Sequence, residues 1–234
     1  MNPFLALFLT FAIAISWLRL MDFFAHKGWL ESRMSRKVIH IGTGPIFVLC
    51  WLLFPEGVSF SRWLAALVPF LISLQFLLVG MGIIKDEAAV QAMSRSGDRR
   101  EILRGPLFYG IMFVVLTLVY WRESPIGMTA LMMMCGGDGI ADLVGQRIKS
   151  PRLPWSRQKS VAGSLAVLVG GFVLSVFVLG IYLLVGALPG SITGYLIPLA
   201  WIALGSMLVE SLPFRDVDNI TVTLAAVLLG HLVF

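Results

Sequence analysis

Two acidic side chains stand in a stretch that is otherwise almost entirely apolar. Asp138 and Asp142 lie four residues apart in MMMCGGDGIADLVGQRIK. On a helix this spacing places both carboxylates on one face, where they would repel each other and resist ionisation in an apolar setting. Mg²⁺ removes both difficulties, since it is commonly held by one or two carboxylates together with phosphates. We predict that both aspartates are catalytic metal ligands. The alternative is a pair that faces a polar cavity or forms ion pairs with Arg147 or Lys159.

The following segment, RIKSPRLPWSRQKSVAGS, is strongly basic and leads into an apolar helix at Ser160. A helix N-terminus offers free N–H groups and partial positive charge to phosphate oxygens, and Lys159 adds a point charge. The alternative is an ordinary basic loop of a membrane protein, and the Walker A pattern is absent. We predict nucleotide binding by these side chains and helix-start residues: Arg147, Arg157, Lys159, Ser160, Gly163 and Ser164.

A second acidic group follows in VESLPFRDVDNITV. Glu210 is a predicted third metal ligand, and Asp218 is a predicted catalytic acid that could take an alcohol proton. Asn219 is a possible further site residue, while Asp218 or Asn219 could instead cap the last helix. In SRKVIH, Lys37 and His40 share a helix face and are possible site residues. Contact of these two side chains with lipid headgroups is an equally good account.

The elements that position these residues must be membrane-spanning. The chain has 234 residues, of which 58% are hydrophobic and only 13% charged, and its mean hydropathy is +0.90. An average so apolar would leave hydrophobic surface in water in a soluble fold, whereas a bilayer accepts it. The net charge of +5 is explained by basic loops, so we expect no nucleic acid partner.

Eight apolar segments approach the length of about 20 residues that a bilayer requires. Three of them are short, so the predicted fold is an all-α transmembrane bundle of seven or eight spans, forming a single integral membrane domain over residues 1–234. The segments cover approximately residues 3–18, 38–54, 62–84, 105–121, 125–145, 160–186, 194–212 and 219–234.

Basic residues are distributed very unevenly between the two sides of such a bundle. The connections 19–37, 85–104, 146–159 and 210–218 hold five, five, five and one Lys or Arg, which is 16 of the 18 in the chain. Because cytoplasmic loops are enriched in Lys and Arg, these four connections are predicted to be cytoplasmic and the N-terminus non-cytoplasmic. The predicted site residues then gather near the cytoplasmic face.

Six strings in order resemble the phytol kinase family: RKVIHIGTG, RGPLFYG, YWRESPIGM, CGGDGIADLVG, QKSVAGS and VESLP…DNITV. The resemblance runs from about Arg36 to the C-terminus. It implies a membrane enzyme that transfers the terminal phosphate of a nucleoside triphosphate, commonly CTP with Mg²⁺, to an isoprenoid alcohol such as phytol or geranylgeraniol. The relatives carry two adjacent acids before the asparagine, where this chain has Val217 and Asp218, so Asp216 could substitute in that loop.

Two other functions remain open from the sequence. A lipid cytidylyltransferase would also use CTP and acids, but its motifs match less closely. A cation-coupled transporter would place acids near a broken helix and would favour inverted repeats, which the sequence lacks. No Arg- and Ser-rich organelle transit peptide begins the chain. We therefore expect a bacterial or cyanobacterial inner or thylakoid membrane, with the site facing the cytoplasm.

Overall fold

The computed structural model describes residues 1–29, 32–94, 96–214 and 217–234; the side chains of Asp22, Ala25, His26, Ser32, Arg33 and Asp138 lie outside the description. The predicted all-α membrane bundle is confirmed. Six helical stretches within these ranges are long and apolar enough to cross a membrane. They are built on α1 (Pro3–His26), α2 (Ser32–Cys50) with the short η1 (Trp51–Leu53), α3 (Ser61–Met81), α5 (Gly105–Val119), α8 (Val161–Leu184) and α9 (Ile192–Glu210).

Two further segments complete the bundle. One is the shorter apolar helix α10 (Asp218–Val233). The other was predicted as one span over residues 125–145 and consists of three consecutive pieces: α6 (Pro125–Met132), the π-helical η3 (Met133–Asp138) and α7 (Gly139–Arg147). Together with the six long stretches, they agree with the prediction of seven or eight spans.

The π-helical piece lies where the glycines of this segment meet α8. A Cβ added to Gly136 would lie 2.9 Å from the carbonyl oxygen of Gly170, and one added to Gly170 would lie 2.6 Å from the carbonyl oxygen of Gly136. Only glycine allows so close an approach of two backbones. Short π-helical insertions are rare in proteins, and those that do occur often lie at functional sites. Gly136 and Gly170 therefore permit the close packing of the π-helical piece on α8.

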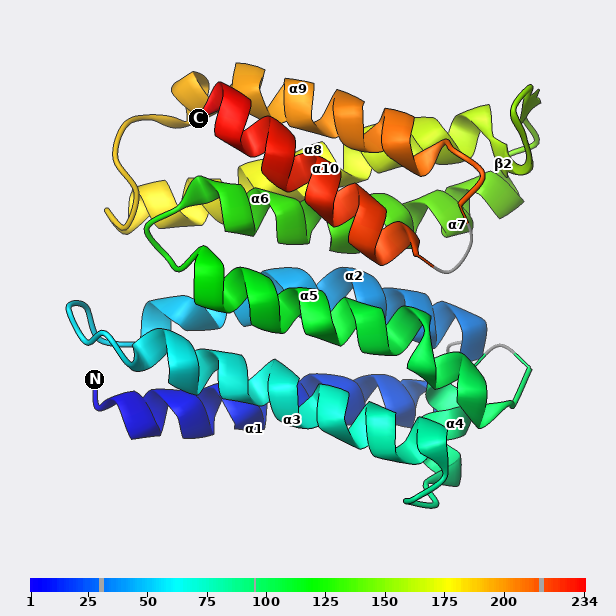
Figure 1. Cartoon of the computed structure of the whole chain (residues 1–234), viewed down its shortest axis with the longest axis horizontal. Coiled ribbons are helices and arrows are strands. Elements are labelled where there is room, and N and C mark those ends of the chain that lie inside the picture. Colours follow the sequence, from blue (N-terminus) through cyan, green and yellow to red (C-terminus); the bar gives the residue numbers. More distant parts are fainter. Residues whose placement is uncertain (30–31, 95, 215–216) are drawn as a thin grey trace.

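The bundle has two groups of helices, which Figure 1 shows one above the other. The first group contains α1, α2, α3 and α5, and the second contains α6 to α10. Helix α2 contacts η3 and α7, while α5 contacts α6 and α10, so these contacts join the groups. Tyr182 of α8 reinforces the junction by donating a hydrogen bond to the carbonyl oxygen of Val48, at 2.6 Å.

The outer surface of the bundle is apolar. Large hydrophobic side chains such as Phe8, Phe177, Ile197 and Leu228 are more than half exposed on four different helices. A chain folded in water would not leave so many in contact with solvent, whereas lipid accommodates them. The chain is a polytopic membrane protein.

The connections between spans carry short elements of their own. Helix α4 (Glu87–Met93) and the 3₁₀-helix η2 (Arg99–Leu103) lie in the connection predicted over residues 85–104. The basic connection 146–159 contains an antiparallel hairpin of β1 (Arg152–Leu153) and β2 (Ser156–Ser160). In Figure 1, α4, β2 and the start of α10 lie at one end of the bundle, and the N- and C-termini lie at the other.

Candidate active site

A cavity of about 870 Å³ opens at the end of the bundle that carries α4 and the hairpin. We call it the polar cavity. It is lined by residues from both helix groups, including α2, α7, β2, α8 and the adjoining ends of α9 and α10. Nine of the residues singled out from the sequence line it: Lys37, Asp142, Lys159, Ser160, Gly163, Ser164, Glu210, Asp218 and Asn219.

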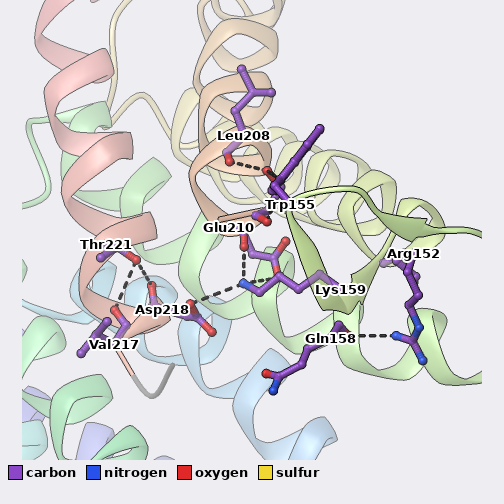
Figure 2. A network of polar contacts seen from close by, with 12 residues as sticks. Arg152, Trp155, Gln158, Lys159, Leu208, Glu210, Val217, Asp218 and Thr221 are labelled. Atoms are coloured by element: carbon purple, nitrogen blue, oxygen red, sulfur yellow. Dashed lines mark hydrogen bonds and ion pairs between the residues drawn. The ribbon is translucent and has the colours of Figure 1, made fainter. Parts of the chain in front are cut away.

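Lys159 lies between two carboxylates of the polar cavity. Its Nζ is 3.0 Å from Oε1 of Glu210 and 3.5 Å from Oδ1 of Asp218, and it also donates to the carbonyl oxygen of Glu210. Figure 2 shows the three side chains pointing toward one another from β2, the end of α9 and the start of α10. The Lys159 and Glu210 side chains are only 15% and 7% exposed. Opposite charges so close attract each other strongly where little water screens them, and this attraction offsets part of the cost of burying them.

A second ion pair crosses between the two helix groups. Nζ of Lys37 in α2 lies 3.1 Å from Oδ2 of Asp142 in α7. Asp142 also accepts a hydrogen bond from the side-chain nitrogen of Gln146, one turn further along α7. The alternative partners of Asp142 named from the sequence were Arg147 and Lys159, and the structure places Lys37 there instead. The reason is that α2 packs against α7, a long-range contact with no local sequence signal.

The N-terminus of α8 opens into the same polar cavity. Ser160 is the N-cap of this helix, and its Oγ accepts a hydrogen bond from the backbone N–H of Gly163 at 3.2 Å. A Cβ on Gly163 would lie 3.2 Å from the carbonyl oxygen of Ala141, so glycine allows α7 to approach the helix start. Ser164 is buried, and within the described part of the chain its Oγ has no hydrogen-bond partner. The helix start therefore presents a polar surface suited to an anion.

Asn219 lies in the first turn of α10 and is only 9% exposed. Its Nδ2 donates a hydrogen bond to the carbonyl oxygen of Gly105 at 3.1 Å, which joins α10 to the start of α5. Its Oδ1 has no hydrogen-bond partner among the residues that the structure describes. A buried amide oxygen without a hydrogen-bond partner can accept a hydrogen bond from a ligand hydroxyl.

Three predicted site residues lie elsewhere. Arg147 and Arg157 are exposed and do not line the polar cavity. Arg157 lies in β2 next to Gln158 and Lys159, and only these last two residues of the three line the cavity. His40 lines a neighbouring apolar cavity, where its ring stacks on Tyr109 with the centroids 4.3 Å apart.

Two predicted acids lie partly or wholly outside the described residues. The side chain of Asp138 lies outside the description, although its backbone ends the π-helical piece directly before α7. Asp216, named as a substitute acid, is outside the described residues altogether.

Several lining residues were missed by sequence reasoning. Glu101, Arg104, Gly105 and Pro106 line the polar cavity from the connection before α5 and the start of that helix, and Arg152 lines it from β1. Arg104, Gly105 and Pro106 begin the string RGPLFYG, one of the six that resemble the phytol kinase family. The signal that could have identified it is an arginine placed directly before a helix start, on the same side of the membrane as the other site residues.

The oxygen ligands of the polar cavity suit a hard divalent cation. Asp142, Glu210 and Asp218 contribute carboxylates to one cavity, and oxygen ligands are those that Mg²⁺ prefers. Within the described side chains, no group of three or more His, Cys, Asp or Glu is close enough to hold a metal as it stands. Asp142 and Glu210 are instead neutralised by Lys37 and Lys159. Of the predicted metal ligands, Asp142 and Glu210 thus share a cavity.

Fold and site together define a polytopic membrane protein with a mixed-charge cavity at one end of its bundle. The chain is 42% identical over 98% of its length to a probable chloroplastic phytol kinase of Triticum aestivum, covering 77% of that protein. It is 38% identical to the chloroplastic farnesol kinase of Arabidopsis thaliana, with 96% of this chain and 73% of that protein covered. The chain belongs to the phytol kinase family.

The remaining comparisons add two points. No protein-family profile matches the chain, and no solved structure matches it. The relatives named above are chloroplastic plant proteins, so they do not support the bacterial membrane expected from the sequence.

Proposed function

We propose that this chain is a kinase that transfers the terminal phosphate of CTP to the hydroxyl of an isoprenoid alcohol, such as phytol or geranylgeraniol, and releases CDP. The observation that carries the proposal is the meeting of two different cavities. The polar cavity, with its lysines and carboxylates, shares part of its wall with an apolar cavity inside the bundle. An enzyme that joins a triphosphate to a lipid alcohol needs both environments side by side.

The reaction requires few covalent steps from the protein. The alcohol oxygen forms a bond to the γ-phosphorus while the bond from that phosphorus to the β,γ-bridging oxygen breaks. The hydroxyl proton passes to a carboxylate, and CDP leaves with the bridging oxygen. Catalysis of such a transfer rests mainly on positioning and on neutralising charge.

The lysines of the polar cavity supply positive charge for the triphosphate. Lys159 lies beside the N-terminus of α8, so its ammonium group and the first N–H groups of that helix can bind neighbouring phosphate oxygens. Its ion pairs with Glu210 and Asp218 hold it at this position before the nucleotide binds. The exposed Arg147 and Arg157 are better suited to attracting the anion than to holding it.

The carboxylates have two proposed tasks. Asp138, Asp142 and Glu210 are the residues proposed to hold Mg²⁺, which when bound neutralises charge on the β- and γ-phosphate oxygens. Asp218 is the proposed acceptor of the hydroxyl proton, because it lies on the side of the polar cavity where Asn219 also lines the apolar cavity. We further propose that this end of the bundle faces the cytoplasm, as the distribution of basic residues indicates.

The test is transfer of label by the purified protein in lipid nanodiscs. With CTP labelled on the γ-phosphate, Mg²⁺ and phytol or farnesol, we expect labelled prenyl monophosphate. With CTP labelled on the α-phosphate, we expect no labelled lipid. Label from the α-phosphate in the lipid, together with release of pyrophosphate, would instead identify a cytidylyltransferase. Equal or faster transfer from UTP or ATP would contradict the assignment of CTP.

A further inference from the structure

The apolar cavity lies within the first helix group and has a volume of about 200 Å³. Its walls come from α1, α2, α3 and α5, with side chains such as Ala14, Phe47, Val68 and Phe113. It is a different space from the polar cavity, whose walls lie mainly in the second helix group. Most of the side chains that line this cavity are apolar, which suits a hydrocarbon better than a nucleotide.

The lining residues run along the helices. On α2 the lining residues extend from Lys37 to Cys50. They recur every three or four positions, so they lie on one face of the helix. At 1.5 Å per residue this face is about 20 Å long. That is roughly two thirds of the hydrocarbon thickness of a bilayer, which is about 30 Å. The cavity is therefore long and narrow, and Thr10, Cys50 and Val68 line the end remote from Lys37.

The other end of the apolar cavity opens toward the reacting groups. Lys37, Gly105, Pro106 and Asn219 line both cavities, so these residues form a shared mouth. Among the described residues, Oδ1 of Asn219 has no hydrogen-bond partner, and it can accept a hydrogen bond from a hydroxyl held at this mouth. A hydroxyl at the mouth would face the polar cavity while the attached chain extends toward Cys50.

We infer that the apolar cavity holds the tail of the isoprenoid alcohol and that its remote end, lined by Thr10, Cys50 and Val68, sets the longest tail that the enzyme accepts. The identity of the occupant as an alcohol rests on the proposed function. An alcohol already dissolved in the bilayer gains little by moving into an equally apolar cavity. The cavity therefore selects tails by length and places the hydroxyl, and it adds little to affinity.

The test narrows the apolar cavity at two depths. Val68→Phe adds bulk at the remote end, and Ala14→Phe adds it closer to the mouth. Their matched controls, Leu67→Phe and Ile15→Phe, add the same ring to neighbouring residues that face outward, 37% and 45% exposed. Each variant is assayed with geraniol, farnesol, geranylgeraniol and phytol, which have two, three, four and four isoprene units.

We expect Val68→Phe to lower kcat/KM for geranylgeraniol and phytol by at least about tenfold relative to farnesol, since a misfit of one or a few methylenes costs that much. Ala14→Phe should lower kcat/KM for farnesol as well, and it should leave kcat/KM for geraniol unchanged. Retained geraniol activity shows that a variant is folded. Both control variants should keep the wild-type order of substrates. The same order of substrates in Val68→Phe and Leu67→Phe would overturn the inference.

A second measurement on the wild-type protein separates the inference from the proposed function. A geranylgeraniol analogue with a terminal diazirine is photolysed in nanodiscs, and the labelled peptides are identified. Adducts on α1, α2, α3 or α5 near Thr10, Cys50 or Val68 support the inference, whether or not phosphate is transferred. Adducts confined to outward-facing residues overturn it. Failure of the wild-type protein to phosphorylate any alcohol, with adducts at these residues, would overturn the proposed function alone.

Discussion

The ammonium group of Lys159 lies 3.0 Å from the carboxylate of Glu210, although the two residues are 51 positions apart in the chain. This pair joins the hairpin strand β2 to the end of α9 and is almost completely buried. It holds a positive charge beside the start of α8 and keeps an acid neutralised in a setting of low polarity. The pair can therefore be both a structural link and the resting form of a catalytic arrangement.

The structural and catalytic contributions of this pair can be separated by a double variant. Glu210→Gln leaves a buried lysine with Asp218 as its remaining charged partner among the described residues, so we expect a loss of up to about 3 kcal/mol of stability. Adding Lys159→Met removes the unpaired charge and should restore much of that loss. Thermal unfolding in detergent measures both effects. Activity should remain low in the double variant, and its recovery together with stability would show that the pair has only a structural role.

Asp142 is proposed to bind Mg²⁺, which predicts a change in metal dependence. Asp142→Asn removes a negative oxygen ligand, so the Mg²⁺ concentration for half-maximal activity should rise at least about tenfold, equivalent to 1.4 kcal/mol. The control is Glu87→Gln, which removes one acidic charge from an exposed position in α4. A magnesium titration of initial rates distinguishes them. Equal half-maximal concentrations in Asp142→Asn and Glu87→Gln would contradict a metal-binding role.

Because α8 packs closely on the π-helical piece, we expect the effect of a Gly→Ala substitution on stability to depend strongly on its position in α8. Gly170→Ala would place a methyl group 2.6 Å from the carbonyl oxygen of Gly136, so we expect a loss of about 1–3 kcal/mol. Gly180 is in the same helix, and a Cβ there has no neighbour within 4 Å among the described residues. Gly180→Ala should be neutral or slightly stabilising. Midpoints of thermal unfolding compare the two variants, and equal effects would contradict the packing described here.

Asn219 should affect the alcohol more than the nucleotide. Asn219→Ala removes the acceptor proposed for the hydroxyl, so KM for farnesol should rise by about fivefold to tenfold, as expected for one lost hydrogen bond of about 1 kcal/mol. KM for CTP should change by less than about twofold, because the proposed phosphate contacts come from Lys159 and α8. Steady-state kinetics with each substrate varied in turn measures both. A larger effect on CTP would assign Asn219 to the nucleotide instead.

Much of the fold could be predicted because a membrane span is visible in the local sequence as a long run of apolar residues. Long apolar runs gave the positions of α3, α8 and α9 within three residues at each end, whereas α1 continues to His26, beyond the predicted end at residue 18. The hairpin at residues 152–160 was not predicted, since a short polar strand pair has no periodic hydrophobic signal. Arg157 and Lys159 were both predicted to bind the nucleotide because both belong to the basic segment that leads into α8.

Many residues of the candidate site could be predicted from the sequence, but the ion pairs between them could not. Intramembrane acids and a basic helix start are visible in the sequence, and the polar cavity gathers most of them. The ion pair of Lys37 with Asp142 depends on α2 packing against α7, which no local pattern encodes. The apolar cavity has walls from several helices, so it could be found only in three dimensions.

The most direct test of the central claim compares two basic residues two positions apart in β2. Lys159 lines the polar cavity, while Arg157 is exposed and does not. With γ-labelled CTP and phytol, we predict that Lys159→Ala lowers kcat/KM by about a hundredfold or more, as loss of a group that stabilises developing charge does. Arg157→Ala should retain most of the activity. Similar activities of the two variants, with both proteins folded in the membrane, would contradict phosphoryl transfer in this cavity.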